Sequence, residues 1–171
     1  MDALKEKIRS VPDFPKAGIN FFDITTLLRD AVGFRSAIEA IAKPFEGNRV
    51  DIVVGVESRG FILGGAVADR LGAGFAPVRK KGKLPSHTVQ ETYDLEYGTD
   101  CLEIHSDAVE RGQRVLIVDD VLATGGTAAA TSALVRKLGG DVQALAFLIE
   151  LQFLNGRSRL GREIIHSVLK Y

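Results

Sequence analysis

Short apolar runs alternate along this chain with stretches of helical periodicity. The runs at residues 51–57, 114–121 and 142–151 are almost wholly apolar, which indicates strands buried on both faces. Apolar residues from Phe34 to Phe45 instead recur three and four positions apart, as they do on one face of a helix. Strands that alternate with helices predict an α/β fold, with a mostly parallel twisted sheet and helices on both of its faces.

Weaker patterns account for much of the remaining chain. We expect a short amphipathic segment at 4–8, a helix at 60–71, a strand at 74–79, a helix at about 127–138 and a last strand at 163–169. Gly72 and Gly139 follow the two helices, where glycine commonly ends a helix. Residues 80–100 are polar and long for a connection, so they predict a flexible lid, with a hairpin as the alternative.

Length and composition limit the possible functions. The 171 residues suggest one domain. Basic and acidic residues number 22 each, which gives a net charge of zero and argues against a polybasic nucleic-acid binder. We expect no membrane span, because no run of about 18 apolar residues occurs, and no signal peptide. The single cysteine, Cys101, excludes an intrachain disulfide and favours a cytoplasmic protein.

The segment at 115–130 carries the clearest chemistry. An apolar strand leads to two adjacent acids, Asp119 and Asp120, and the sequence TGGT (124–127) then precedes a helix. Glycines let the backbone approach a ligand, and the free amides at a helix start hold anions. Both acids can face a ligand only if the strand finishes there. Carboxylates beside a phosphate cradle suit sugar hydroxyls or a magnesium ion, so we expect a site for a phosphorylated ribose.

This segment, VLIVDDVLATGGT (115–127), closely resembles the phosphoribosyl-pyrophosphate-binding signature of the type I phosphoribosyltransferases. Further segments resemble one family among them, the adenine phosphoribosyltransferases, in order and spacing: FPKAGINFFDIT (14–25), ESRGF (57–61), RKKGKLP (79–85) and YDLEYG (93–98). The resemblance covers nearly the whole chain. It implies the type I phosphoribosyltransferase fold for a single domain at 1–171, with a small base-binding hood at 1–33 and a flexible lid at 80–100.

The resemblance also implies a reaction. Enzymes of this family join N9 of adenine to the 5-phosphoribosyl group of 5-phosphoribosyl 1-pyrophosphate, giving AMP and pyrophosphate in purine salvage. The implied cofactor is Mg²⁺, held mainly by the substrate rather than by the protein alone. The implied assembly is a cytoplasmic homodimer that binds neither nucleic acid nor membranes.

Residue roles follow from the matching motifs. The resemblance assigns the 5′-phosphate to Ala123, Thr124, Gly125, Gly126 and Thr127. It assigns the ribose hydroxyls to Asp119 and Asp120. It assigns pyrophosphate to Ser58, Arg59, Arg79, Lys80 and Lys83. Arg79 is expected to reach the site of a partner subunit, and a cis peptide bond is expected between Glu57 and Ser58. Adenine is expected against Phe21 and Leu151, and the expected catalytic residue is Glu96 in the lid.

Alternatives remain for single residues and for the function. Leu151 is also explained as a buried strand residue, and Phe22, which stands where many relatives have arginine, as core packing. Two other functions stay open: a phosphoribosyltransferase for another purine, and a non-catalytic regulator that binds phosphoribosyl pyrophosphate. The stretch FLIELQFL (147–154) lacks the lysine that reads the 6-oxo group in hypoxanthine-guanine enzymes. A chain of 171 residues leaves no room for an added nucleic-acid-binding module.

Overall fold

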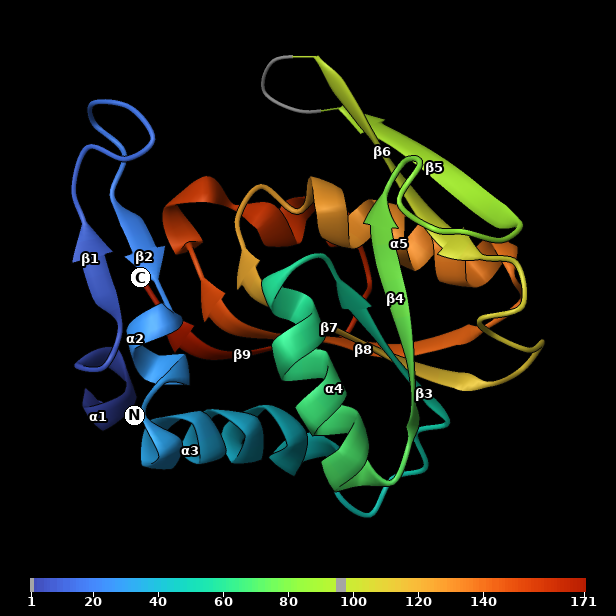
Figure 1. Cartoon of the computed structure of the whole chain (residues 1–171), viewed down its shortest axis with the longest axis horizontal. Coiled ribbons are helices and arrows are strands. Elements are labelled where there is room, and N and C mark those ends of the chain that lie inside the picture. The colour runs from blue at the N-terminus through green and yellow to red at the C-terminus, as the bar shows by residue number, and fades with distance from the viewer. Residues whose placement is uncertain (1, 95–97) are drawn as a thin grey trace.

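The computed structural model describes residues 2–94 and 98–171. Its centre is a seven-stranded sheet in the order β5-β6-β4-β3-β7-β8-β9 (Figure 1). Five adjacent strands of this sheet run parallel to one another. They are β3 (Ile52–Val56), β4 (Gly74–Lys80), β7 (Arg114–Leu122), β8 (Asp141–Glu150) and β9 (Ile165–Lys170). The predicted α/β fold with a mostly parallel sheet is confirmed.

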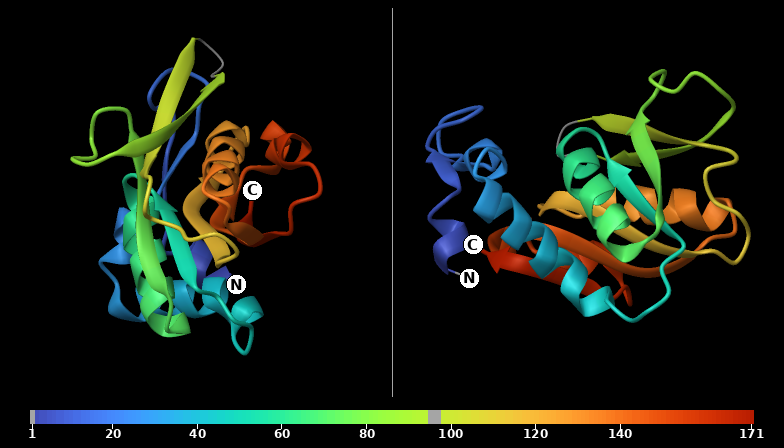
Figure 2. Two further views of the ribbon diagram at one scale, coloured as in Figure 1. Left: turned by 90° about the vertical axis from the view of Figure 1, so that its right-hand side faces the viewer. Right: turned by 60° about the horizontal axis from the view of Figure 1, so that its bottom comes forward.

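Helices cover both faces of the sheet, with α3 and α4 on one side and α5 on the other (Figure 2). Their bounds are α3 (Ala31–Ala42), α4 (Arg59–Leu71) and α5 (Gly126–Lys137). Successive side chains of a strand point to opposite faces. Val53 and Leu116 therefore pack with α3 and α4, whereas Val54 and Ile117 pack with α5, and all four are fully buried. Burial on both faces explains why these strands have continuous apolar sequences.

Local signals set the ends of the helices. The carboxylate of Asp30 accepts the backbone N–H of Gly33 at 2.6 Å, so α3 begins a few residues before the periodic pattern that predicts it. The same pattern extends past the end of α3 because a 3-10 turn, η1 (Lys43–Phe45), follows directly and contains Pro44. Gly72 adopts a left-handed φ of +66° and ends α4 as predicted.

The N-terminal segment forms a separate two-stranded antiparallel sheet of β1 (Arg9–Val11) and β2 (Phe21–Asp23). Short helices flank it: α1 (Asp2–Lys5) and α2 (Thr25–Leu28). The ring of Phe22 lies on the ring of Tyr171, with centroids 4.0 Å apart. Phe22 therefore packs the small sheet against the residue that follows β9, which favours its core-packing interpretation.

About half of the segment predicted as a lid, residues 80–100, forms strands. β5 (Thr88–Asp94) and β6 (Thr99–His105) pair antiparallel, and β6 pairs with β4 at Arg79↔Glu103 and Lys80↔Leu102. The hairpin alternative therefore describes this segment better than an irregular loop. Its polar composition suits β5, which is the outer strand of the sheet. That the hairpin is flexible stays a prediction.

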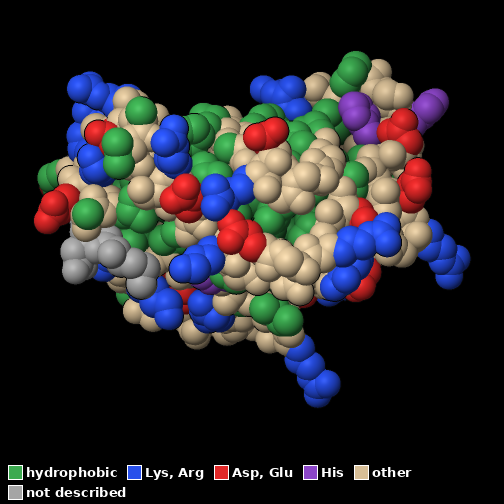
Figure 3. All heavy atoms as spheres, turned by 90° about the horizontal axis from the view of Figure 1, so that it is seen from below, with side chains coloured by type: hydrophobic (Ala, Val, Ile, Leu, Met, Phe, Trp, Pro, Cys, Tyr) green, Lys and Arg blue, Asp and Glu red, His purple; other side chains and the backbone are tan. Residues whose placement is uncertain are grey.

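Charge is evenly distributed over the visible surface. Acidic and basic side chains are mixed on the face shown in Figure 3, in keeping with their equal numbers in the chain. Among the described residues, no helix combines the length and the apolar character needed to cross a membrane.

Candidate active site

The loop between β7 and α5 forms a small hollow of about 80 Å³. Gly125 has a φ of +84°, which favours glycine, and α5 begins at Gly126, close to the predicted start. The first amides of a helix have no carbonyl partner within it, so they favour an anion. The residues predicted to hold a 5′-phosphate line this one hollow: Ala123, Thr124, Gly125, Gly126 and Thr127. We refer to residues 123–127 as the phosphate cradle.

Asp119 and Asp120 lie where β7 loses one of its two neighbouring strands. Pairing with β3 ends at Gly55↔Val118, whereas pairing with β8 continues to Leu122↔Glu150. The prediction that the strand finishes at the acids therefore holds only on the β3 side, and β7 itself runs on to Leu122. The strand end at β3 leaves space beside the acids for the turn that follows it.

The two carboxyl groups have different surroundings. Asp120 is only 7% exposed, and its Oδ2 accepts a hydrogen bond from Nε of Arg59. Oδ1 of Asp119 accepts the backbone N–H of Asp120 at 2.8 Å and lies under the start of α4, where a Cβ on Gly60 would come within 2.8 Å of it. Burial, together with the adjacent charge of Asp120, raises the pKa of Asp119 well above its ordinary value. Hydroxyl donors or a cation supplied by a ligand would relieve this repulsion.

Ser58 and Arg59 lie in the turn from β3 to α4. The Glu57–Ser58 peptide bond is cis, as the resemblance implies. Ser58 is exposed. Besides its bond to Asp120, Arg59 has its Cζ 5.7 Å from the ring centroid of Phe21. Arg59 thus contacts both a predicted ribose acid and the predicted platform for the base.

The other basic residues predicted to bind pyrophosphate lie near the same turn. Nε of Arg79 donates to Oε2 of Glu57 at 3.0 Å, and its terminal amino group donates to the carbonyl oxygen of Lys83 at 3.3 Å. Nζ of Lys80 lies 3.0 Å from Oδ2 of Asp100, and this ion pair lowers the pKa of Asp100. Lys83 is exposed. In this structure Arg79 therefore has partners within its own chain.

A pocket of about 530 Å³ lies between the N-terminal sheet and α4, and its lining is Arg9, Val11, Phe14, Phe21, Asp23 and Arg59. The rings of Phe14 and Phe21 meet edge to face, with centroids 5.3 Å apart. A flat aromatic ligand would find aromatic and cationic walls there. Leu151 does not line this pocket; it follows β8 and packs, half-buried, against the main core.

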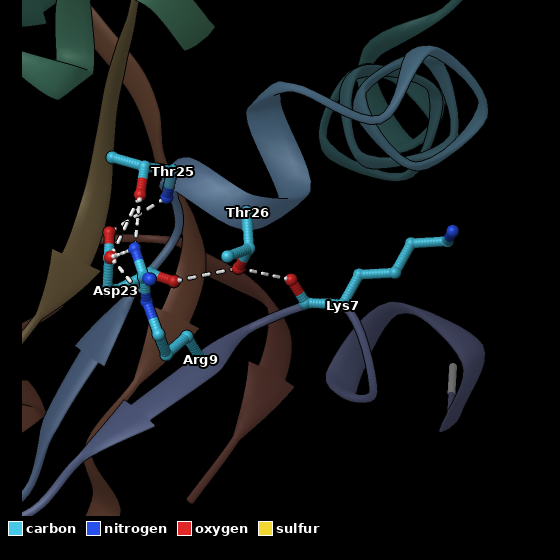
Figure 4. A network of polar contacts seen from close by, with 5 residues as sticks. All are labelled: Lys7, Arg9, Asp23, Thr25 and Thr26. Carbon is cyan, nitrogen blue, oxygen red and sulfur yellow. Dashed lines mark hydrogen bonds and ion pairs between the residues drawn. The ribbon is translucent and has the colours of Figure 1, made fainter.

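Two lining residues of this pocket, Arg9 and Asp23, belong to a network of polar contacts (Figure 4). Oδ2 of Asp23 accepts from Nε of Arg9 at 3.0 Å and from the hydroxyl of Thr25 at 2.8 Å, and Oδ1 accepts the backbone N–H of Thr25 at 2.9 Å. The bonds from Thr25, and then the Arg9 guanidinium, lower the pKa of Asp23 to about 2. The hydroxyl of Thr26 donates to the carbonyl oxygen of Lys7 at 2.7 Å. These contacts tie β1 to β2 and α2.

Sequence reasoning misses Arg9, Val11, Phe14 and Asp23 in the lining of the aromatic pocket, and Gly60 beside Asp119. Phe14 and Gly60 fall inside segments that carry the resemblance, so those segments contained the signal. Arg9 lies outside every quoted motif, and only the pairing of β1 with β2 brings it to Asp23. The predicted catalytic residue, Glu96, lies outside the described residues.

The acids beside the phosphate cradle suit a magnesium ion. Mg²⁺ prefers oxygen ligands and is often held by one or two carboxylates together with substrate phosphates. Asp119 and Asp120 are such carboxylates. Within residues 2–94 and 98–171, no cluster of three or more His, Cys, Asp or Glu residues forms a metal site. Two carboxylates at this position fit a Mg²⁺ ion that would take its other ligands from a phosphorylated substrate.

The chain matches known proteins over almost its full length. The family model of the phosphoribosyl transferase domain matches residues 25–160. The adenine phosphoribosyltransferase of Acidobacterium capsulatum is 58% identical over 170 residues, which cover 99% of this chain and 94% of that protein.

Solved structures agree with this match. The adenine phosphoribosyltransferase of Thermoanaerobacter pseudethanolicus superposes with a TM-score of 0.97 at 54% identity, covering 99% of each chain. The Saccharomyces cerevisiae enzyme, complexed with an imino-altritol bisphosphate and adenine, superposes with a TM-score of 0.93 at 41% identity, covering 98% of this chain and 97% of that one. Fold, motifs and overall identity lead to one conclusion: this chain belongs to the adenine phosphoribosyltransferases of the phosphoribosyl transferase family.

Proposed function

We propose that this chain transfers the 5-phosphoribosyl group of 5-phosphoribosyl 1-pyrophosphate to N9 of adenine, releasing pyrophosphate and AMP for purine salvage. The observation that carries the proposal is the position of Arg59, which bonds to Asp120 and lies 5.7 Å from the ring of Phe21. Arg59 thereby links the aromatic pocket to the acid pair, and Asp119 of that pair also lines the hollow of the phosphate cradle. These three parts match the base, the sugar and the 5′-phosphate of AMP.

Each part of the proposed site binds a different part of the substrate. The phosphate cradle holds the 5′-phosphate, and Asp119 and Asp120 accept hydrogen bonds from the ribose hydroxyls. As the bond from C1′ to pyrophosphate breaks, positive charge develops on the sugar, and carboxylates bonded to the ribose hydroxyls would stabilise that charge. Cationic and hydroxyl groups stabilise the departing pyrophosphate: Ser58, Arg59, Arg79, Lys80 and Lys83.

The base binds on the other side of C1′. Phe21 and Phe14 hold the purine ring by stacking and edge contacts. Leu151, which lies outside the aromatic pocket at the end of β8, is proposed to contact the base as well. Glu96 is proposed as the catalytic residue, which either moves the proton at the base or stabilises charge on the sugar. Holding both reactants in line contributes to the rate enhancement, because it turns a bimolecular step into a unimolecular one.

Mg²⁺ is the proposed cofactor, and Asp119 and Asp120 would contact it while the substrate supplies its other ligands. When bound, it would neutralise charge on the pyrophosphate. We also propose a homodimer, in which Arg79 extends to the partner's pyrophosphate site, and a cytoplasmic location. The charge balance and the mixed surface of Figure 3 support a small-molecule enzyme rather than a nucleic-acid-binding regulator.

A purine competition assay tests the function. Protein, Mg²⁺ and phosphoribosyl pyrophosphate are incubated with adenine, hypoxanthine or guanine, and the nucleotide formed is identified. The proposal predicts AMP from adenine alone. IMP or GMP would overturn the assignment of the base pocket while keeping the fold. No nucleotide, with tight binding of phosphoribosyl pyrophosphate, would make the chain a regulator.

A further inference from the structure

Two 3-10 turns follow β8, and the second of them lies directly against the phosphate cradle. Their bounds are η2 (Gln152–Leu154) and η3 (Gly156–Leu160). A Cβ on Gly156 would lie 2.2 Å from the carbonyl oxygen of Ala123, and a Cβ on Gly125 would lie 2.4 Å from the carbonyl oxygen of Gly156. The two backbones therefore touch without room for a side chain between them. Figure 1 shows this segment, in orange-red, beside the start of α5.

An ion pair between a buried carboxylate and a guanidinium whose side chain is 42% exposed restrains the residue next to Gly156. Glu150, the last residue of β8, is 5% exposed and accepts two hydrogen bonds of 2.7 Å from the next residue after Gly156, Arg157. Both carboxylate oxygens are used, each by a different guanidinium nitrogen. This bidentate geometry restrains orientation as well as distance. The same bonds lower the pKa of Glu150.

Glu150 is also tied to the strand that leads into the cradle. It is paired with Leu122, the residue just before Ala123, and the backbone N–H of Leu151 donates to the carbonyl oxygen of Leu122 at 3.0 Å. Glu150 thus lies in the strand next to β7, at the level of the residue just before the cradle. Through Arg157 it also holds η3, the turn that packs against the cradle. A shift of Arg157 would move Gly156, and Gly156 has no free space in which to move.

We propose that Glu150 and Arg157 are positioning residues, which hold the phosphate cradle in the geometry that binds a sugar 5′-phosphate. The inference rests on the proposed use of the cradle for the 5′-phosphate. Neither residue lines the hollow, so both act through Gly156. The loss of either should weaken phosphate binding and leave the base pocket unchanged.

The test measures the binding of ribose 5-phosphate by titration calorimetry in the absence of adenine, for wild type, Arg157→Met, Arg157→Lys and Glu150→Gln. We expect Arg157→Met to weaken binding by at least about tenfold, because small displacements of binding groups have large effects. Arg157→Lys keeps the charge without the bidentate geometry and should fall between Met and wild type. In steady-state kinetics the KM for phosphoribosyl pyrophosphate should rise more than kcat falls, with the KM for adenine unchanged.

Arg136 provides a matched control, since its terminal amino group lies 2.7 Å from Glu163, another largely buried carboxylate. Arg136→Met should lower thermal stability in a similar way but leave ribose 5-phosphate affinity unchanged. Equal affinity of wild type and the Arg157 variants would overturn the inference, as would an equal loss in Arg136→Met. If Arg157→Met does not fold, Arg157→Lys and Glu150→Gln decide.

The same titration separates this inference from the proposed function. If wild type binds ribose 5-phosphate but forms no AMP, the proposed activity fails, and the variants still decide the role of Glu150 and Arg157. If wild type does not bind ribose 5-phosphate, the assignment of the cradle fails and the inference with it.

Discussion

Arg59 and Asp120 are 61 positions apart in the chain, yet Nε of Arg59 donates a hydrogen bond to Oδ2 of Asp120. The bond joins the turn after β3 to the end of β7. Asp120 is almost completely buried, whereas the side chain of Arg59 is 39% exposed. An arriving anion therefore reaches the guanidinium from the solvent side while the carboxylate holds it from within.

Replacing Arg59 with alanine should raise the KM for phosphoribosyl pyrophosphate by at least about tenfold, because charge-assisted hydrogen bonds to the substrate are lost and a buried carboxylate loses its partner. Initial rates over a range of phosphoribosyl pyrophosphate concentrations give this number. An unchanged KM would remove Arg59 from the pyrophosphate site.

Gly60→Ala should impair catalysis although it adds only one methyl group. That methyl group would lie 2.8 Å from Oδ1 of Asp119, so the carboxylate must move, and kcat/KM for phosphoribosyl pyrophosphate should fall by about tenfold or more. Gly65, on the same helix, is the control, because a Cβ there meets nothing within 4 Å. Gly65→Ala should leave the rate unchanged and raise stability slightly. Equal rates in the two variants would contradict the argument.

Neighbouring phenylalanines should behave differently. Phe21→Ala removes a wall of the aromatic pocket and should raise the KM for adenine several-fold. Phe22→Ala removes the contact with Tyr171 and should cost about 1–3 kcal/mol of stability, with little change in that KM. Urea unfolding and adenine titrations on both variants distinguish these effects, and an adenine defect confined to Phe22→Ala would reverse the assignment.

Asp23 makes stability depend on pH in acid. Its pKa is lowered from 3.8 to about 2 in the folded chain. Its stabilising contribution is therefore complete above the ordinary value and is lost as the pH falls towards 2. Asp23→Asn should reduce stability by about 1 kcal/mol at neutral pH. The difference from wild type should shrink as the pH falls from 3.8 and vanish only below the lowered pKa of about 2. A constant difference across this range, measured by urea unfolding, would exclude the ionised carboxylate as its source.

Subunit mixing tests the proposed role of Arg79. Light scattering should first give twice the chain mass of 18.5 kDa. Arg79→Ala and Asp120→Asn, each nearly inactive alone, are then mixed under conditions that exchange subunits. If Arg79 serves the partner's site, each mixed dimer has one intact site, and about a quarter of wild-type activity returns. No recovery would place Arg79 in the site of its own chain, where its contact with Glu57 already lies.

What could be predicted from the sequence is mostly local. The phosphate cradle, the two acids and the apolar strand before them lie within 13 residues, 115–127, so their arrangement follows from nearby chemistry. The parallel sheet follows from strands that are apolar on both faces. Contacts between distant segments have no such local pattern. The bond from Arg59 to Asp120 and the packing of Gly156 on Ala123 depend on which strands become neighbours.

The hairpin of β5 and β6 is a second feature that the local sequence alone does not determine. Its polar sequence suits either a loop or an outer strand, because both face solvent on at least one side. The pairing of β5 with β6 decides between them.

The order of strands explains why the candidate site lies at the ends of β3 and β7, where Arg59 contacts Asp120. From β3 the chain crosses to β4 on one side, and it later returns to β7 on the other side of β3 before continuing outward to β8 and β9. Connections that leave adjacent parallel strands in opposite directions cannot cover the gap between them, and a crevice opens there whatever the side chains are. The location of the candidate site is therefore a property of chain topology. Substitutions in the two segments at this crevice, 57–60 and 119–127, can therefore change the chemistry of the site. Moving the site to another place requires a different fold.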